Sequence, residues 1–77
     1  KAAESEEMER LLGAEGPTPA TRLGLEAGAA DGDIRVALQN AIGRWQRRAE
    51  NPLSSREIAD ASRVLIRTCE GLLVDLN

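Results

Sequence analysis

Apolar residues recur at intervals of three and four along two long stretches of the chain, the spacing of amphipathic helices. The first stretch, about residues 31–50, carries its apolar stripe on Ile34, Ala37, Leu38, Ala41, Ile42, Trp45 and Ala49. The second, about residues 55–75, carries its stripe on Ile58, Ala61, Leu65, Cys69, Leu72 and Leu76. The connection between them is short, so we predict an antiparallel helical hairpin.

The connection ENPLSS has recognisable stop and start signals. Pro52 restricts the backbone before it and ends the first long helix. Ser54 and Glu57 have the spacing of a capping box, and Leu53 and Ile58 stand where a hydrophobic staple would place them. The pattern therefore predicts that Ser54 caps the second long helix.

A shorter helix is predicted near the start of the chain. Residues 2–12 are rich in Ala, Glu and Leu, which favour helices, and Gly13 ends the run. Thr18 followed by Pro19 resembles an N-cap with proline at the first helical position, which indicates one helical turn over 19–23. Acidic residues near position 31 suit the start of the next helix.

These elements predict an all-α fold: a small three-helix domain spanning residues 1–77, with helices at about 2–12, 31–50 and 55–75. A chain of 77 residues buries only about 60% of its unfolded surface, so packing against further protein is plausible. We expect a module or fragment of a larger protein. The predicted core of the hairpin consists of Ile34, Leu38, Ile42, Trp45, Ile58, Leu65, Cys69 and Leu72.

The residue inventory argues against catalysis. The chain has no His, no Tyr and one Cys, which removes the usual nucleophile pairs and metal sites. Cys69 lies on an apolar stripe and is expected in the core. Asp31 and Asp33 lack the further ligands of a calcium loop, so helix capping explains them better. We therefore expect no enzyme activity, no cofactor and no metal.

A cluster of basic residues is a second candidate for a functional site. The net charge of −3 makes nucleic acid an unlikely general partner. A basic groove could nevertheless form from the candidate interaction residues Arg44, Arg47, Arg48 and Arg63. Acidic residues between positions 4 and 33 could equally neutralise these arginines, and no aromatic residue is interleaved with them.

Apolar residues off the main stripes suggest a protein partner. Val36 and Val64, with Val74, lie off the stripes of their helices, so another element could cover them. We predict no direct membrane insertion, because no apolar run approaches 18 residues. The single cysteine suits a reducing, cytoplasmic setting.

Residues 8–76 resemble the C-terminal region of actinobacterial dynamin-like GTPases of the isoniazid-inducible type. The resemblance is carried by ATRLGL, by RW-x-RRA-x-NPL and by the R-x-CEGLL tail. It implies a helical bundle segment that packs on other helices of its parent protein. The GTPase motifs of such proteins lie upstream and do not occur in this sequence.

A second resemblance is to J domains, through LGLEAGAADGDIRVALQNAIGRW and through RAENP at the corner. The His-Pro-Asp tripeptide is missing, so a degenerate adaptor is the most that this resemblance implies.

We therefore predict a non-catalytic helical protein-interaction or assembly module. Its partner would be another protein, the helices of a parent chain, or a second copy of itself. The alternatives are a J-like adaptor and a basic-patch ligand-binding module.

Overall fold

The structure, a computed structural model, describes the backbone of residues 2–76 and the side chains of residues 4–76. Its elements are α1 (Ala2–Leu11), α2 (Pro19–Arg22), α3 (Asp31–Glu50) and α4 (Arg56–Leu76). No strand occurs among the described residues. The predicted all-α fold is confirmed, and so is the short helical turn that Thr18 and Pro19 indicated.

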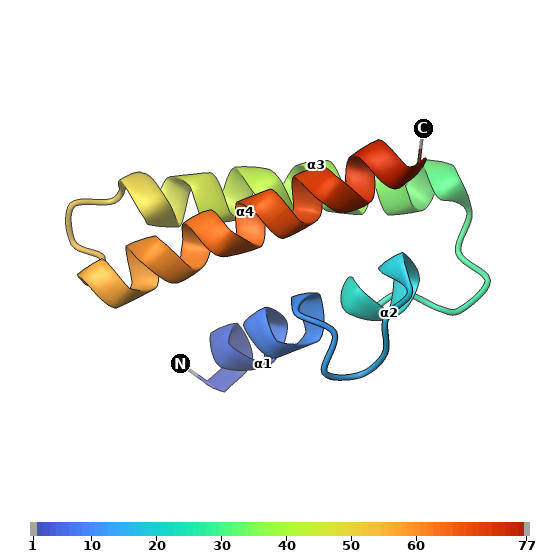
Figure 1. The fold of residues 1–77 in the computed structure, drawn as a ribbon, viewed down its shortest axis with the longest axis horizontal. Helices are drawn as coiled ribbons and strands as arrows, with labels where there is room; N and C mark the ends of the chain where they lie inside the picture. Colours follow the sequence, from blue (N-terminus) through green and yellow to red (C-terminus); the bar gives the residue numbers. More distant parts are fainter. Residues whose placement is uncertain (1, 77) are drawn as a thin grey trace.

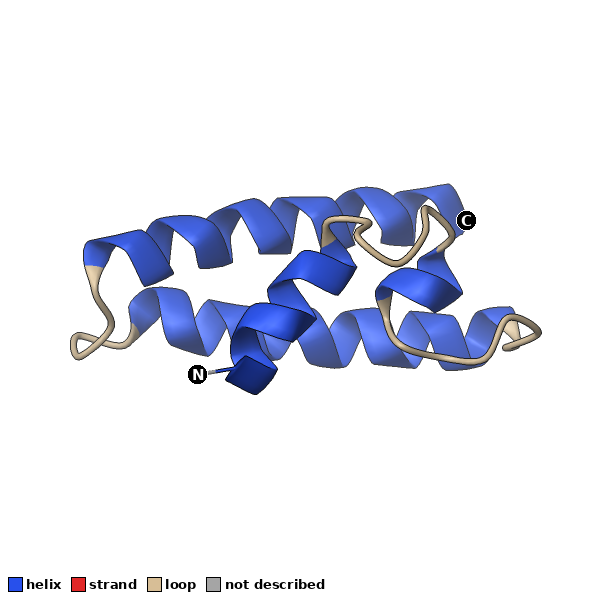
Figure 2. Ribbon diagram, turned by 90° about the horizontal axis from the view of Figure 1, so that it is seen from below, coloured by secondary structure: helices blue, strands red, loops and turns tan. Residues whose placement is uncertain are grey.

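The two long helices form the predicted antiparallel hairpin, and the two short helices lie against one side of it (Figure 1). Seen from below, α1 and α2 lie across the pair of long helices (Figure 2). The described chain is therefore two layers thick, with extents of 37 × 23 × 14 Å. Only one side of the hairpin is covered by α1 and α2.

Every helix contributes to the core. The buried apolar residues are Leu11, Ala20, Ile34, Leu38, Ala41, Trp45, Leu65 and Cys69. Trp45 is only 2% exposed and is the largest of them. The sequence pattern of α3 and α4 located most of this core, whereas Leu11 and Ala20 bring α1 and α2 into it.

Three predicted core residues, Ile42, Ile58 and Leu72, are only half-buried. At 100° per residue, Ile42 lies on the flank of α3 away from the arginines that contact α1. Ile58 and Leu72 lie toward the two ends of α4, where fewer elements converge. Periodicity identified the correct face of each helix but overestimated its burial, because burial also depends on the second layer.

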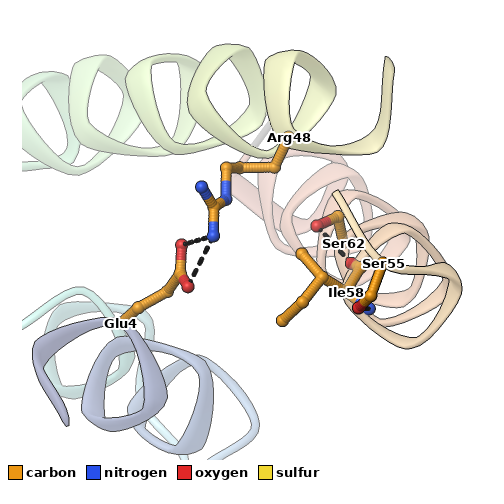
Figure 3. Close-up of polar contacts among 5 residues, drawn as sticks. All are labelled: Glu4, Arg48, Ser55, Ile58 and Ser62. Carbon is orange, nitrogen blue, oxygen red and sulfur yellow. Dashed lines mark hydrogen bonds and ion pairs between the residues drawn. The ribbon is translucent and has the colours of Figure 1, made fainter. Parts of the chain in front are cut away.

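The predicted capping box is wrong by one residue. Ser55, not Ser54, caps α4: its Oγ accepts a hydrogen bond from the backbone N–H of Ile58 at 3.1 Å (Figure 3). With the cap at Ser55, the capping-box position falls on Ile58, which has no carboxylate to return the bond. The first turn of α4 therefore has the serine half of a capping box, without a side chain at position 58 that could accept from the backbone N–H of Ser55.

The predicted hydrophobic staple is also wrong, since Leu53 is 92% exposed. The side chain of Asn51 accepts from the backbone N–H of Leu53 at 2.9 Å, and the Asn51 carbonyl accepts from that of Ser54 at 3.0 Å. This local turn, typical of Asn, carries Leu53 out into solvent and delays the start of α4.

One polar side chain is fully buried among the described residues. Ser62 of α4 is 0% exposed, and its hydroxyl donates to the backbone carbonyl of Ile58 at 2.7 Å (Figure 3). A serine can satisfy its hydroxyl in this way within its own helix, so it needs no polar partner across the hairpin.

Replacing the two serines of the corner separately will identify the cap. We expect Ser55→Ala to lower the free energy of unfolding by about 1 kcal/mol, because the N–H of Ile58 loses its acceptor. Ser54→Ala should change it by less than about 0.5 kcal/mol. Urea unfolding followed by circular dichroism measures both, and the reverse ranking would restore the capping box at Ser54.

Leucine truncations will test the assignment of core and surface. Leu38 is 0% exposed, so we expect Leu38→Ala to cost about 2–5 kcal/mol of unfolding free energy. Leu53→Ala removes the same atoms from an exposed site and should cost less than about 0.5 kcal/mol. Thermal unfolding of the two variants checks this; comparable losses would mean that Leu53 is packed.

Candidate functional site

Two ion pairs hold α1 against α3. Glu7 pairs with Arg44, and both carboxylate oxygens of Glu4 accept from Nη2 of Arg48, at 2.7 Å for Oε1 and 2.5 Å for Oε2 (Figure 3). The two arginine side chains are more than a third exposed, so each pair contributes at most about 1 kcal/mol. These pairs orient α1 more than they stabilise it.

The first pocket of the candidate site lies beside these pairs. It has a volume of about 260 Å³ and is lined by Glu4, Glu7, Arg44, Trp45, Arg47 and Arg48. Arg47 is exposed and makes no ion pair with any described residue. The structure thus brings together three of the four arginines that the sequence singled out.

A second pocket lies on the other side of the Glu7–Arg44 pair. It has a volume of about 190 Å³ and is lined by Glu7, Arg10, Leu11, Arg22, Leu23, Ala37, Asn40 and Arg44. Glu7 and Arg44 line both pockets. The two neighbouring pockets, which share Glu7 and Arg44 as a common wall, make up an arginine-rich region at the junction of α1, α2 and α3, which we call the arginine site.

Arg22, which lines the second pocket, is held in place by two backbone carbonyls. Its Nε donates to the carbonyl of Pro17 at 3.1 Å and its Nη1 to that of Leu11 at 3.5 Å. The Leu11 carbonyl belongs to the last turn of α1, where carbonyls lack partners within the helix and attract cations. Arg22 therefore ties the loop after α1 to the end of that helix.

Gly24 allows the loop after α2 to approach Arg10. Its φ is +74°, and a Cβ at this position would lie 3.0 Å from Nε of Arg10. Any other residue would be strained there and would crowd the guanidinium group. This glycine lets the chain fold closely around the arginine.

The arginine site contains every buried side-chain donor that lacks a partner among the described residues. These donors are Nε of Arg10, Nε1 of Trp45 and Nε of Arg48. All three are N–H groups, and each belongs to a residue that lines one of the two pockets. An unsatisfied buried donor costs about 1–3 kcal/mol of folding free energy. Three such donors in one region therefore mark it as a place where an acceptor group would be stabilising.

The fourth predicted arginine, Arg63, lies elsewhere. It forms the expected surface pair with Asp60 on α4, at 2.8 Å, and does not line the arginine site. Arg10 and Arg22 take part instead, and sequence analysis missed them. No periodic signal marks either one, because their position depends on how the glycine- and proline-containing loop after α1 turns back.

An apolar groove lies between α1 and α4. It has a volume of about 240 Å³ and is lined by Met8, Leu12, Ala61, Val64 and Leu65. Leu12 is 58% exposed and Val64 56% exposed. The other two valines singled out by the sequence, Val36 on α3 and Val74 on α4, are 55% and 69% exposed. Val64 therefore belongs to a shaped surface that includes residues of α1.

Cys69 is unsuited to nucleophilic chemistry. It is 0% exposed. The pKa of its thiol is raised from 9.0 to about 11, chiefly by burial; the charge of Arg44 lowers the pKa, and those of Glu7 and Glu70 raise it. The reactive thiolate is therefore scarce at neutral pH. Among the described residues, no group of three or more His, Cys, Asp or Glu side chains is placed to hold a metal ion.

No helix among the described residues has both the length and the apolar character that a membrane span requires.

Sequence comparison connects the chain with one kind of protein. It is similar to part of IniC. The isoniazid-induced protein IniC from two strains of Mycobacterium tuberculosis is 31% identical to it over 70 residues. The match covers 91% of this chain but only 14% of the length of IniC. No family model matches the sequence, and no solved structure matches it either.

This similarity agrees with the resemblance to proteins of the isoniazid-inducible type that the ATRLGL and R-x-CEGLL segments suggested. Because the chain spans about one seventh of IniC, the similarity concerns a helical segment and not the activity of the whole protein.

The raised pKa of Cys69 predicts a specific pH dependence of stability. The unfolded thiol ionises near pH 9, whereas the folded thiol keeps its proton until about pH 11. The unfolded state therefore gains stability as the pH rises from about 9 to 11, and the free energy of unfolding should fall by about 1–3 kcal/mol in all.

Urea unfolding at pH 8 and at pH 10.5 measures this fall. The chain has no Tyr, so few other groups titrate in this range, and Cys69→Ala should remove most of the dependence. An equal fall in the Cys69→Ala variant would show that another group is responsible.

Proposed function

We propose that this chain is a non-catalytic helical assembly module that packs against other helices of a longer polypeptide of the dynamin-like, isoniazid-inducible type. The observation that carries the proposal is the apolar groove between α1 and α4. A helix from elsewhere in the same polypeptide is the occupant that we assign to it.

The groove has the chemistry of a helix-docking surface. Its five lining residues are all apolar, and Leu12 and Val64 expose more than half of their surface. Covering apolar surface gains about 25 cal/mol for each Å² removed from water. Recognition of a helix in a groove rests on such side chains, presented by two neighbouring helices.

The similarity to IniC supports an occupant within the same polypeptide. The matching segment makes up only 14% of IniC, so in that protein it is accompanied by a much longer stretch of chain. A small two-layer helical unit with an open apolar groove is suited to complete its packing against such neighbouring chain.

The absence of catalysis is part of the proposal. The chain has no His and no Tyr, and its one thiol is buried with a raised pKa. Any nucleotide chemistry of the parent protein would then reside in other segments. We assign the module to the cytoplasm on the basis of its single, unpaired cysteine. The J-like adaptor and self-association remain predictions that no observed contact favours.

Site-specific photo-crosslinking in the full-length polypeptide will test whether a helix docks in the apolar groove. A benzoylphenylalanine in place of Val64 should crosslink to a helix outside this segment but within the same polypeptide, as mapped by mass spectrometry. The same group in place of Leu53, which is 92% exposed, is the matched control and should give at most about one tenth of that yield.

Two outcomes would reject the proposed occupant. Crosslinks from position 64 that join two identical chains would show that the groove binds a second copy. Equal yields from positions 64 and 53 would show that the groove is simply open to solvent.

A further inference from the structure

We propose that the first pocket of the arginine site binds a small phosphate-bearing molecule, whose oxygens accept from the unpartnered donors of Trp45 and Arg48. This site is formed by α1, α2 and α3 and does not depend on the docking of a helix in the apolar groove.

Local charge favours an anion. The site gathers five guanidinium groups, those of Arg10, Arg22, Arg44, Arg47 and Arg48, around only two carboxylates, Glu4 and Glu7. The chain as a whole carries a net charge of −3, so this surplus of positive charge is local. A dianionic phosphate would offset it better than a single carboxylate.

The unpartnered donors define the type of group that is required. The indole N–H of Trp45 is a donor only, and so is each arginine Nε. A metal cation or an apolar ligand in the first pocket would leave the donors of Trp45 and Arg48 unsatisfied, whereas an oxyanion offers several acceptor oxygens. Trp45 is 2% exposed, so its N–H is shielded from the bulk solvent that would otherwise satisfy it.

The walls of the site are already fixed. Arg22 is held by the carbonyls of Leu11 and Pro17, and the loop at Gly24 closes around Arg10. Arg44 and Arg48 are oriented by Glu7 and Glu4. Binding would therefore require little ordering of side chains, which favours affinity.

Arg47 is the residue best suited to test the site. It lines the first pocket, lies on the exposed side of α3 and has no ion pair with a described residue, so its replacement should not disturb the fold. Arg67 of α4 is also exposed and lines neither pocket. Arg67→Gln therefore changes the net charge equally and serves as the matched control.

Trp45 provides the signal, because it is the only tryptophan of the chain. We would titrate the 77-residue chain with inorganic phosphate, pyrophosphate and succinate at constant ionic strength and record tryptophan fluorescence. We expect a saturable change with phosphate and pyrophosphate. Arg47→Gln should weaken binding by about tenfold or more, the loss typical of one charge-assisted hydrogen bond. Arg67→Gln should bind like the parent chain.

A further titration distinguishes free from membrane-presented phosphate. Vesicles of phosphatidylglycerol in phosphatidylcholine should produce no greater change than pure phosphatidylcholine vesicles. A response to the anionic vesicles without one to pyrophosphate would overturn the assignment to a small molecule.

Other results would overturn the proposal as well. Equal affinity for succinate would show that the site does not select phosphate. An equal loss of binding in the Arg47→Gln and Arg67→Gln variants would indicate general charge attraction. The absence of any saturable change, with helicity intact by circular dichroism, would mean that the arginines serve only to hold α1 in place.

Discussion

The packing of α3 against α4 is the interaction on which the rest of the structure depends. Leu38, Ala41 and Trp45 of α3 meet Leu65 and Cys69 of α4, and each of the five is at most 2% exposed. Neither helix could keep its apolar face in water, and a helix of about 20 residues gains most of its stability from such packing. The buried serine of α4 satisfies its own hydroxyl, so this seam needs no polar contact between the helices.

The second layer is held differently. Helix α1 contributes one fully buried leucine, Leu11, and two partly exposed ion pairs, so its attachment combines a small apolar contact with charge. The Glu7–Arg44 pair also lines both pockets, and the Glu4–Arg48 pair lines the first. The arrangement that positions α1 is therefore also the one that gathers arginines from three helices into one region.

Much of the fold could be predicted from the sequence because the determining signals are local. The three- and four-residue spacing of apolar residues predicted both long helices. Thr18 followed by Pro19 predicted the short helix α2. The cap of α4 was misplaced because Ser54 and Ser55 are adjacent, and the choice between them depends on the turn made by Asn51. Arg10 and Arg22 could not be predicted to meet Arg44, since their approach depends on the path of two loops.

The order of the helices along the chain has a consequence for synthesis. Met8 of α1 and Leu12 just after it share the groove with Ala61, Val64 and Leu65 of α4, which leave the ribosome roughly fifty residues later. At about 5–20 residues per second, α1 spends several seconds without its packing partner. Its four glutamates, Glu4, Glu6, Glu7 and Glu9, keep the emerging segment strongly hydrated during this interval. The same glutamates that orient the folded helix thus give the emerging α1 segment a concentrated negative charge, and like charges disfavour association between copies.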